Sequence, residues 1–292
     1  MRNVLLPRSL SELWDHLRAG SGAAVYAGGT DLLVKMRGGL VIPSLLICLE
    51  RIEELKGVSE DLGAIRIGAG TTHAELLAHP VIRAHLPVLA SALGTLGSPP
   101  IRNMGTIGGN ICTASPAGDT LPPLHVLNAE VELLTKSGVR RMSVKDFITG
   151  PGKTCLQEEE ILSAVWIGKP EGHNVHHFEK VGQRNALACA IASFAALLRI
   201  SAEGIVEKAS MAWGSVAPTI LTCPEAEKTL VGERISLKRL REAAAIVRNT
   251  VRPISDVRAD ADYRRNVSGN LLLRLMEVQT PDDCARLNQL PA

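Results

Sequence analysis

The chain has 292 residues, a length that favours two domains or one large folded unit with subdomains. Its 32 Lys and Arg residues nearly balance 30 Asp and Glu residues, and no block of like charge stands out. This excludes the basic footprint of a nucleic-acid-binding protein. Hydrophobic residues make up 46% and charged residues 21%, which excludes general disorder.

The sequence lacks the signals of a membrane or secreted protein. The longest nearly apolar stretch, residues 186–198, is shorter than the roughly 20 residues that a membrane span requires. The N-terminal residues 1–7 have neither a long apolar segment nor a small-residue cleavage site. We therefore expect a soluble, cytoplasmic protein with no membrane span and no nucleic-acid partner.

The cysteines are widely dispersed, at positions 48, 112, 155, 189, 223 and 284, and no Cys-x-x-Cys spacing occurs. Iron–sulfur clusters and structural zinc sites draw on closely spaced thiolates. The spacing predicts buried, reduced thiols and no metal site on this chain.

Periodicity predicts alternating helices and strands in the first hundred residues. A capping-box pattern at 9–12 precedes apolar residues on one helical face, and glycines end that pattern. The expected elements are a helix over 10–17, a strand over 23–27, a helix over 32–36, strands over 44–49 and 64–68, and helices within 74–96 that are broken at Pro80 and Pro87.

Residues 97–123 are the segment richest in glycine, proline and small polar residues. A segment of this length and composition inside a compact domain is usually a functional loop region. We therefore expect residues 97–123 to be a functional loop.

The pattern in the second half of the sequence predicts two hairpins, followed by helices near the C-terminus. The expected elements are strands over 130–135 and 139–144, a strand over 160–167, a boundary near 169–172, paired strands over 190–200 and 205–213, and helices over 237–249 and 263–278. For 190–200 periodicity alone leaves helix and strand open, and pairing across the turn at 201–204 favours strand.

Two glycine-containing segments are candidates for phosphate binding. Residues 28–31 (GGTD) and 106–110 (TIGGN) are each flanked by strand-like residues. Glycine permits positive φ and leaves backbone N–H groups unshielded, so successive amides can converge on an anion. Thr30, Thr106 and Asn110 add neutral donors. From these residues alone, ordinary tight turns remain the alternative interpretation.

An ordered set of motifs runs along nearly the whole chain: AGGTDLL (27–33), IRNMGTIGGN (101–110), ASPAGD (114–119), GPGKT (150–154), EIL (160–162), FEKVGQR (178–184), WGSVAPT (213–219) and ADYRR (261–265). Each motif is weak alone. Together they resemble the FAD-binding medium subunit of the molybdenum hydroxylases, the relatives of xanthine dehydrogenase and carbon monoxide dehydrogenase. The motif detail is most similar to the bacterial xanthine dehydrogenase type.

This resemblance implies an α+β fold in three parts. Residues 1–55 and 56–170 would form a two-part FAD-binding domain of the PCMH and vanillyl-alcohol-oxidase-like type. Residues 171–292 would form a C-terminal α+β domain of the carbon monoxide dehydrogenase flavoprotein type. FAD would lie extended between the first two parts, and the C-terminal domain would help to enclose it.

The resemblance also implies which residues bind FAD without a covalent bond. One segment would wrap the pyrophosphate, a second would form the opposite wall, and single residues would add polar or packing contacts. These residues are Val25, Tyr26, Ala27, Gly28, Gly29, Thr30, Asp31 and Leu32, then Thr106, Ile107, Gly108, Gly109 and Asn110, and singly Thr113, Asp119, Leu162 and Lys180.

Asp119 and Lys180 carry the charges of this implied site. Asp119 suits ribose or ribityl hydroxyls because an ionised carboxylate accepts two hydrogen bonds. Its alternative is an N-cap before Leu121. Lys180 matches the lysine beside the flavin, where a cation would raise the flavin potential. Its alternative is an exposed strand lysine.

The implied function is electron transfer through FAD, with no acid or base catalyst on this chain. A partner would oxidise substrate at a molybdopterin centre and another would relay electrons through 2Fe–2S clusters. This chain would pass them from FAD to NAD or another acceptor. Alternatives are the FAD subunit of a carbon monoxide, nicotinate, other N-heterocycle or aldehyde dehydrogenase, a self-contained flavoprotein oxidase, and a non-catalytic nucleotide-binding module.

Overall fold

The computed structural model describes residues 3–19, 22–61, 63–170 and 172–278, and these form two compact units. The first unit lies within 1–79, 98–114 and 129–168. The second lies within 80–97, 115–128 and 169–292. Segments 80–97 and 115–128, which our sequence division places in the middle part, therefore pack with the C-terminal residues.

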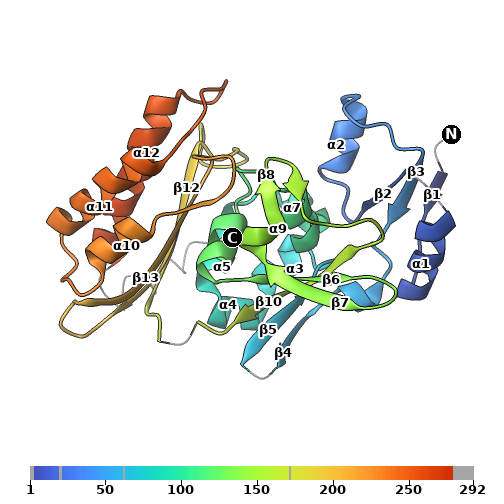
Figure 1. Cartoon of the computed structure of the whole chain (residues 1–292), viewed down its shortest axis with the longest axis horizontal. Helices are drawn as coiled ribbons and strands as arrows, with labels where there is room; N and C mark the ends of the chain where they lie inside the picture. The colour runs from blue at the N-terminus through green and yellow to red at the C-terminus, as the bar shows by residue number, and fades with distance from the viewer. Residues whose placement is uncertain (1–2, 20–21, 62, 171, 279–292) are drawn as a thin grey trace. The chain divides into compact units, whose positions relative to one another are not determined.

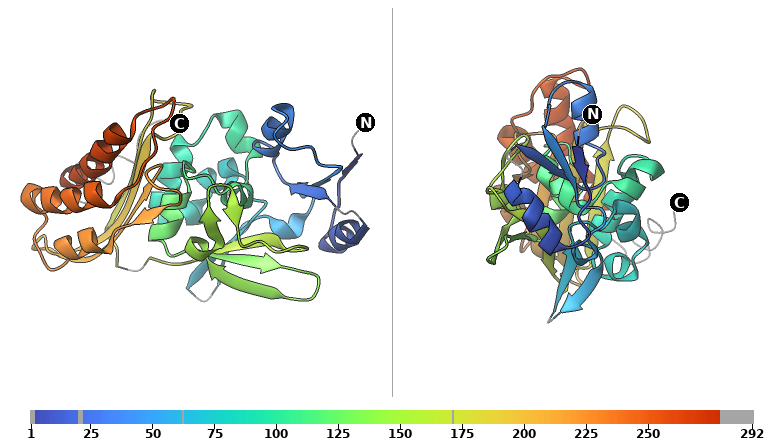
Figure 2. Two further views of the ribbon diagram at one scale, coloured as in Figure 1. Left: turned by 45° about the horizontal axis from the view of Figure 1, so that its top comes forward. Right: turned by 90° about the vertical axis from the view of Figure 1, so that its right-hand side faces the viewer.

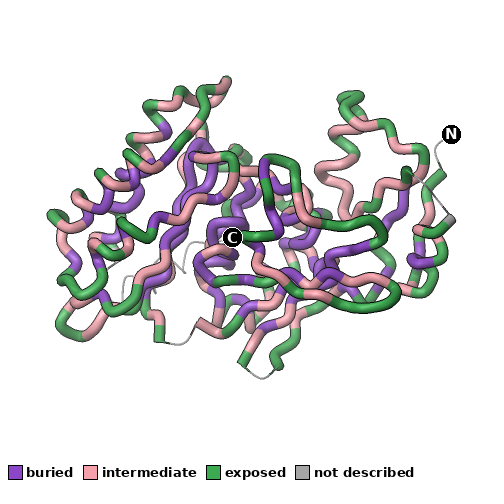
Figure 3. The backbone as a smooth tube through the Cα atoms, in the orientation of Figure 1, coloured by how far each residue is buried: buried purple, intermediate pink, exposed green. Residues whose placement is uncertain are grey.

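The first unit begins with a three-stranded parallel sheet. Its strand order is β1 (Asn3–Leu5), β3 (Leu45–Cys48), β2 (Ala23–Tyr26). Helix α1 (Leu10–Ala19) connects β1 to β2, and α2 (Leu32–Arg37) connects β2 to β3. A small core gathers Leu13, Trp14, Ile47, Ile52, Leu55 and Ile161. Helix α2 buries none of its residues (Figure 3).

A five-stranded antiparallel sheet follows in the same unit, and its β6–β7 hairpin is visible in Figure 2. The strand order is β4 (Val58–Asp61), β5 (Ala64–Gly68), β10 (Ile161–Gly168), β6 (Glu130–Leu134), β7 (Val139–Ser143). Alternation places Ile65, Ile67, Val131, Leu133 and Val165 in the core. The smaller elements of this unit are η1 (Glu53–Leu55), α3 (His73–Ala78), α9 (Val144–Phe147), β8 (Ile148–Gly150) and β9 (Lys153–Thr154).

Residues 97–123 differ from the loop that we expected. They contain α6 (Pro99–Met104) and α7 (Ile107–Thr113) in the first unit, and α8 (Leu121–Val126) begins within them in the second. Ser98 caps α6 and Thr106 caps α7, each by accepting a backbone hydrogen bond three residues later. Prolines occupy the first turns of α6 and α8, where a missing N–H costs nothing. The loop prediction is therefore wrong.

The second unit is built on a four-stranded antiparallel sheet whose order is β11 (Val175–Val181), β12 (Ala192–Ile200), β13 (Val206–Gly214), β14 (Leu221–Thr222). Helices α10 (Pro224–Leu230), α11 (Leu237–Thr250) and α12 (Ala261–Leu273) lie along one face, and α12 continues into η2 (Arg274–Val278) (Figure 1). The other elements are α4 (Pro80–His85), α5 (Pro87–Thr95) and α8.

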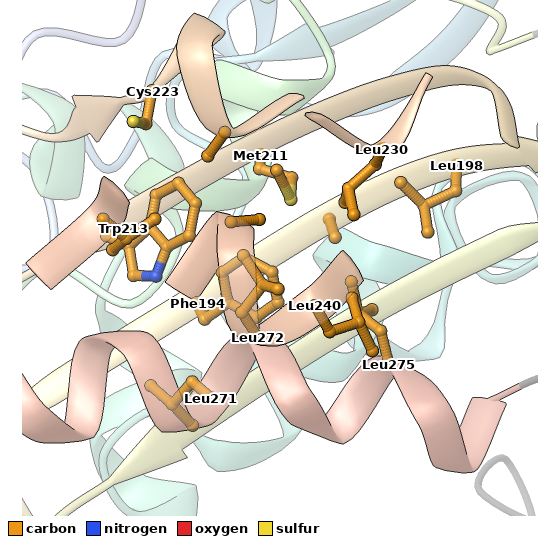
Figure 4. Close-up of a cluster of buried hydrophobic side chains, with 14 of the residues drawn as sticks. Phe194, Leu198, Met211, Trp213, Cys223, Leu230, Leu240, Leu271, Leu272 and Leu275 are labelled. Atoms are coloured by element: carbon orange, nitrogen blue, oxygen red, sulfur yellow. The ribbon is translucent and has the colours of Figure 1, made fainter. Parts of the chain in front are cut away.

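The core of the second unit lies between that sheet and its helices. Phe194 and Trp213 stack with ring centroids 4.9 Å apart, and Met211, Leu240 and Leu272 are fully buried beside them (Figure 4). The indole Nε1 of Trp213 donates to the carbonyl of Ser268 on α12 at 3.0 Å. Residues 192–198 of β12 are all buried, and apart from Phe194 their side chains are small or aliphatic.

The remaining expectations for the elements are confirmed, including the strand at β12 and the helices at α11 and α12. Among the cysteines that the structure describes, all five are unpaired; Cys48 and Cys223 are buried, but Cys189 is exposed, so burial of every thiol was wrong. Cys284 lies outside the described residues. In the described ranges no helix has the length and apolar character that crossing a bilayer requires.

Candidate functional site

The GGTD segment forms a turn between β2 and α2. Gly29 has φ +70°, a conformation that L side chains rarely adopt, so this turn requires glycine. The amides of residues 28–31 donate no hydrogen bond to any other residue that the structure describes. All four residues are only half-buried, so these N–H groups can be reached from outside the fold. The turn therefore has four amides available for an anionic ligand.

Gly28 serves a different purpose from Gly29. A Cβ at Gly28 would lie 1.6 Å from the carbonyl oxygen of Met104, so only glycine permits this approach. A cavity of about 200 Å³ includes Ala27, Gly28, Met104 and Thr106 in its lining. The structure thus brings the first glycine segment next to the second, which the sequence placed 75 residues later.

The second glycine segment is not the amide nest that we expected. Thr106 and residues 107–110 form the N-terminus of α7. The amides of residues 107–110 all have acceptors inside the chain. Ile107 donates to the Thr71 carbonyl (3.1 Å), Gly108 to the Ala69 carbonyl (2.9 Å), Gly109 to Thr106 Oγ1 (3.1 Å) and Asn110 to the Thr106 carbonyl (2.9 Å). A Cβ at Gly108 would lie 2.6 Å from Ala69 Cβ. Close packing against Ala69, and not positive φ, explains that glycine.

Asp31 and Thr113 are brought together, although 82 residues separate them. Thr113 Oγ1 donates to Asp31 Oδ2 at 3.2 Å, and Lys35 Nζ lies 2.7 Å from the same oxygen. Asp31 thereby ties the start of α2 to the end of α7. The hydrogen bond between Asp31 and Thr113 is therefore a structural contact between two helices of the first unit.

In the second unit, Asp119 and Lys180 form a direct ion pair. Lys180 Nζ donates to Asp119 Oδ2 at 2.7 Å and to the Thr95 carbonyl at 2.7 Å. The side chain of Lys180 is 8% exposed and that of Asp119 is 9% exposed. Lys180 is therefore not the exposed strand lysine of the alternative interpretation, and the N-cap of α8 is Thr120 and not Asp119.

The register of the sheet determines the face of the sheet on which the Lys180 side chain lies. Lys180 pairs with Ser193 on β12, which in turn pairs with Gly214 on β13, so all three occupy one row of the same face. A Cβ at Gly214 would lie 2.4 Å from Ser193 Oγ and 3.1 Å from Pro122 Cγ. The glycine of the WGSVAPT motif therefore lets residues of the Pro116–Pro122 region approach this row.

Burial determines the protonation of the titratable groups near these motifs. It raises the pKa of Asp119, and the Lys180 ammonium opposes that rise. Burial, together with a hydrogen bond to Cys48, raises the pKa of Tyr26 to about 12, so its phenol stays protonated. Burial also raises the pKa of Cys112 to about 12, so this cysteine is a thiol at neutral pH.

The remaining predicted residues lie in the first unit. Leu162 is a buried residue of β10 opposite Leu133, and Val25 to Ala27 lead from β2 into the glycine turn. Sequence reasoning missed the carbonyls of Met104 and Thr95, because a backbone acceptor leaves no residue-type signal. In the described part of the chain, no cluster of three His, Cys, Asp or Glu side chains is placed to hold a metal ion.

These features fit FAD in two respects. The free amides at 28–31 suit the negative charge of a pyrophosphate. Asp119 Oδ1 is buried with no hydrogen-bond partner among the described residues, although a buried carboxylate oxygen normally has one. A ligand that supplies a donor there would satisfy it. The full set of predicted contact residues remains a prediction.

Comparison with known proteins agrees with this fit. Residues 1–170 match the family described as "FAD binding domain in molybdopterin dehydrogenase", and residues 177–278 match "CO dehydrogenase flavoprotein C-terminal domain". The chain is 33% identical over 245 residues to the putative xanthine dehydrogenase FAD-binding subunit of Escherichia coli, with 83% of each chain covered. It is 32% identical, with the same coverage, to the nicotinate dehydrogenase FAD-subunit of Eubacterium barkeri.

Solved structures show the same relationship. The reconstituted carbon monoxide dehydrogenase of Oligotropha carboxidovorans contains a chain with a TM-score of 0.90 and 32% identity, covering 96% of this chain and 97% of that one. The two family matches cover residues 1–170 and 177–278, and these relatives cover 83% to 96% of this chain. The chain therefore belongs to the family of FAD-binding medium subunits of the xanthine and carbon monoxide dehydrogenases, which are molybdenum hydroxylases.

Proposed function

We propose that this chain is the FAD-binding electron-transfer subunit of a multi-subunit molybdenum hydroxylase of the xanthine dehydrogenase type. It would work in the cytoplasm with an iron–sulfur subunit and a molybdopterin subunit, on which the 2Fe–2S clusters and the molybdenum centre reside. The names of relatives in xanthine, nicotinate and carbon monoxide dehydrogenases support an assembly of this kind. Substrate identity belongs to the molybdenum-bearing chain.

One observation carries the proposal: four successive amides at residues 28–31 lack acceptors in the described chain, around a Gly29 whose φ is positive. FAD supplies the redox chemistry when bound, because its ring accepts electrons singly and passes them on singly or as hydride. The amides at 28–31 would bind its pyrophosphate without a lysine. Gly28 and Met104 would hold that turn in place.

The second unit would contribute Asp119 and Lys180. Lys180 brings a buried positive charge, and a cation close to a flavin favours its reduced form. No proton donor or base for substrate is required of this chain. The role of this chain is to bind FAD and set its potential.

NAD is the acceptor that we propose, as in the xanthine dehydrogenase type. Covalent attachment of flavin through a cysteine, as in some self-contained flavoprotein oxidases, would need a reactive thiol. Cys112, the cysteine nearest the second motif in sequence, has its pKa raised to about 12 by burial. We therefore propose FAD that is bound without a covalent bond.

The test is reduction of the co-expressed complex without oxygen. Xanthine, nicotinate and carbon monoxide are added separately, and the visible absorbance of oxidised FAD is followed. We expect one substrate class to bleach FAD, and NAD⁺ to restore the absorbance. Restoration only by an artificial dye would contradict NAD as acceptor. Full activity of this chain without its partners would contradict the subunit assignment.

A further inference from the structure

The Asp119–Lys180 pair has hydrogen-bonding capacity that the protein does not use. An ammonium has three donors, and the described residues accept two of them, through Asp119 Oδ2 and the Thr95 carbonyl. Asp119 Oδ1 has no partner in the same part of the chain. One donor of Lys180 and one acceptor of Asp119 therefore remain unused on a pair that is about nine-tenths buried.

Stability alone does not account for such a pair. Removing two charges from water costs several kcal/mol per ion, and the cost is recovered only when the remaining polar atoms are also satisfied. Here one carboxylate oxygen is not satisfied. A buried orphan of this kind calls for an explanation, and a ligand group that donates to it is the chemical class that fits.

The two contacts of Lys180 also restrict where its ammonium lies. Thr95 ends α5, and Asp119 precedes α8, so two separate segments of the second unit hold one Nζ from two directions. The ion pair also balances the positive charge. Lys180 is therefore a fixed and partly neutralised cation, unlike a free strand lysine.

We propose that Asp119 is a positioning residue for Lys180: with the Thr95 carbonyl it fixes and balances the ammonium through Oδ2, and it keeps Oδ1 for one hydrogen bond from FAD. This inference rests on the proposed function. It differs from the expectation that Asp119 accepts two hydrogen bonds from ribose or ribityl hydroxyls. It predicts that the two residues act on FAD as a coupled pair.

The test is a four-member cycle in the co-expressed complex: the unchanged protein, Asp119→Asn, Lys180→Met and the double variant. Flavin midpoint potential and FAD affinity after reconstitution are both measured. Asp119→Asn leaves the cation unbalanced and should raise the potential. Lys180→Met removes the cation and should lower the potential. The double variant should lie between the two.

FAD affinity gives a second readout that applies even if a single variant is purified empty. Each single substitution should weaken FAD binding on the order of tenfold or more. The double variant should lose less than the product of the two single losses, because the partners are coupled. Independent effects, or potentials that shift in the same direction in both single variants, would overturn the proposal.

Glu179→Gln is the matched control. Glu179 neighbours Lys180 on β11, but it pairs with Phe194 and so belongs to the opposite face, where it lies 3.2 Å from Arg274. It should retain FAD with an unchanged potential. If the unchanged protein and this control both lack FAD, the proposed function fails and the pair proposal fails with it. If both retain FAD and the cycle shows independent effects, only the pair proposal fails.

Discussion

Gly28 and Met104 approach each other so closely that no larger residue than glycine fits at position 28. The Met104 carbonyl oxygen would lie 1.6 Å from a Cβ on Gly28, and its carbonyl carbon 2.4 Å away. Both atoms are backbone, so no side-chain rotation can relieve the clash. This contact joins the turn with four free amides to the segment that leads into α7.

Gly28→Ala should therefore displace the turn and release FAD. We expect lost FAD retention together with a lower free energy of unfolding, because the backbone of either segment must move. Gly138→Ala is the control, since a Cβ there meets nothing within 4 Å and its φ is not positive. FAD content and urea unfolding are measured for both. Full FAD retention by Gly28→Ala would contradict the account of this contact.

Gly29 and Gly39 form a natural comparison on either side of α2. Their φ values are +70° and +71°, so alanine costs about 1–2 kcal/mol of backbone strain at each position. Only Gly29 lies among the free amides. FAD affinity should fall about tenfold or more in Gly29→Ala and remain unchanged in Gly39→Ala. Equal affinity in the two variants, measured by FAD titration, would show that the turn at 28–31 does not bind the cofactor.

Thr106 should contribute to stability through its cap on α7. Its Oγ1 accepts from the Gly109 amide at 3.1 Å, and the residue is 6% exposed. Thr106→Val keeps the shape and removes the acceptor, which should lower the free energy of unfolding by about 1 kcal/mol. Thr106→Ser keeps the acceptor and should lose less. Urea unfolding compares them, and equal losses would exclude the cap as the cause.

His73 should make the protein less stable in mild acid. It is 3% exposed, and burial, with a further contribution from Arg102, lowers its pKa from 6.5 to about 4. Between these values the unfolded chain binds a proton that the folded chain does not, so stability falls as the pH falls through this range. The loss between about pH 7.5 and about pH 5 should be about 2 kcal/mol.

His73→Gln removes this titration and serves as the comparison for the same measurement. Other groups titrate equally in both proteins, so the difference between their unfolding curves isolates His73. The variant should show the smaller loss on acidification. Identical pH dependence in both proteins would mean that folding does not lower the pKa of His73.

Local patterns predicted most elements, because periodicity and pairing across turns depend on neighbouring residues. The strand β12 was ambiguous by periodicity, and the turn before β13 resolved it correctly. The error came at 97–123, where glycine and proline were counted as helix breakers. Proline in a first helical turn and Gly108 packed on Ala69 are compatible with helix, and only the tertiary contact reveals the second.

The candidate site was less accessible to sequence reasoning. Local pattern suggested an N-cap at Asp119 and a solvent-exposed Lys180, and both alternatives are wrong because the two side chains bind each other across 61 residues. The resemblance identified both positions but not their contact. Asp31 and Thr113 show the same limit, since their hydrogen bond joins positions that no local rule connects.

The most direct test of the central claim is the FAD content of the purified complex. The protein is denatured with acid, and the released flavin is identified and quantified against the amount of this chain. We predict an equimolar amount of FAD in the supernatant, with none left on the precipitated protein. A folded, assembled complex that contains no FAD, and binds none when FAD is added, would contradict the account.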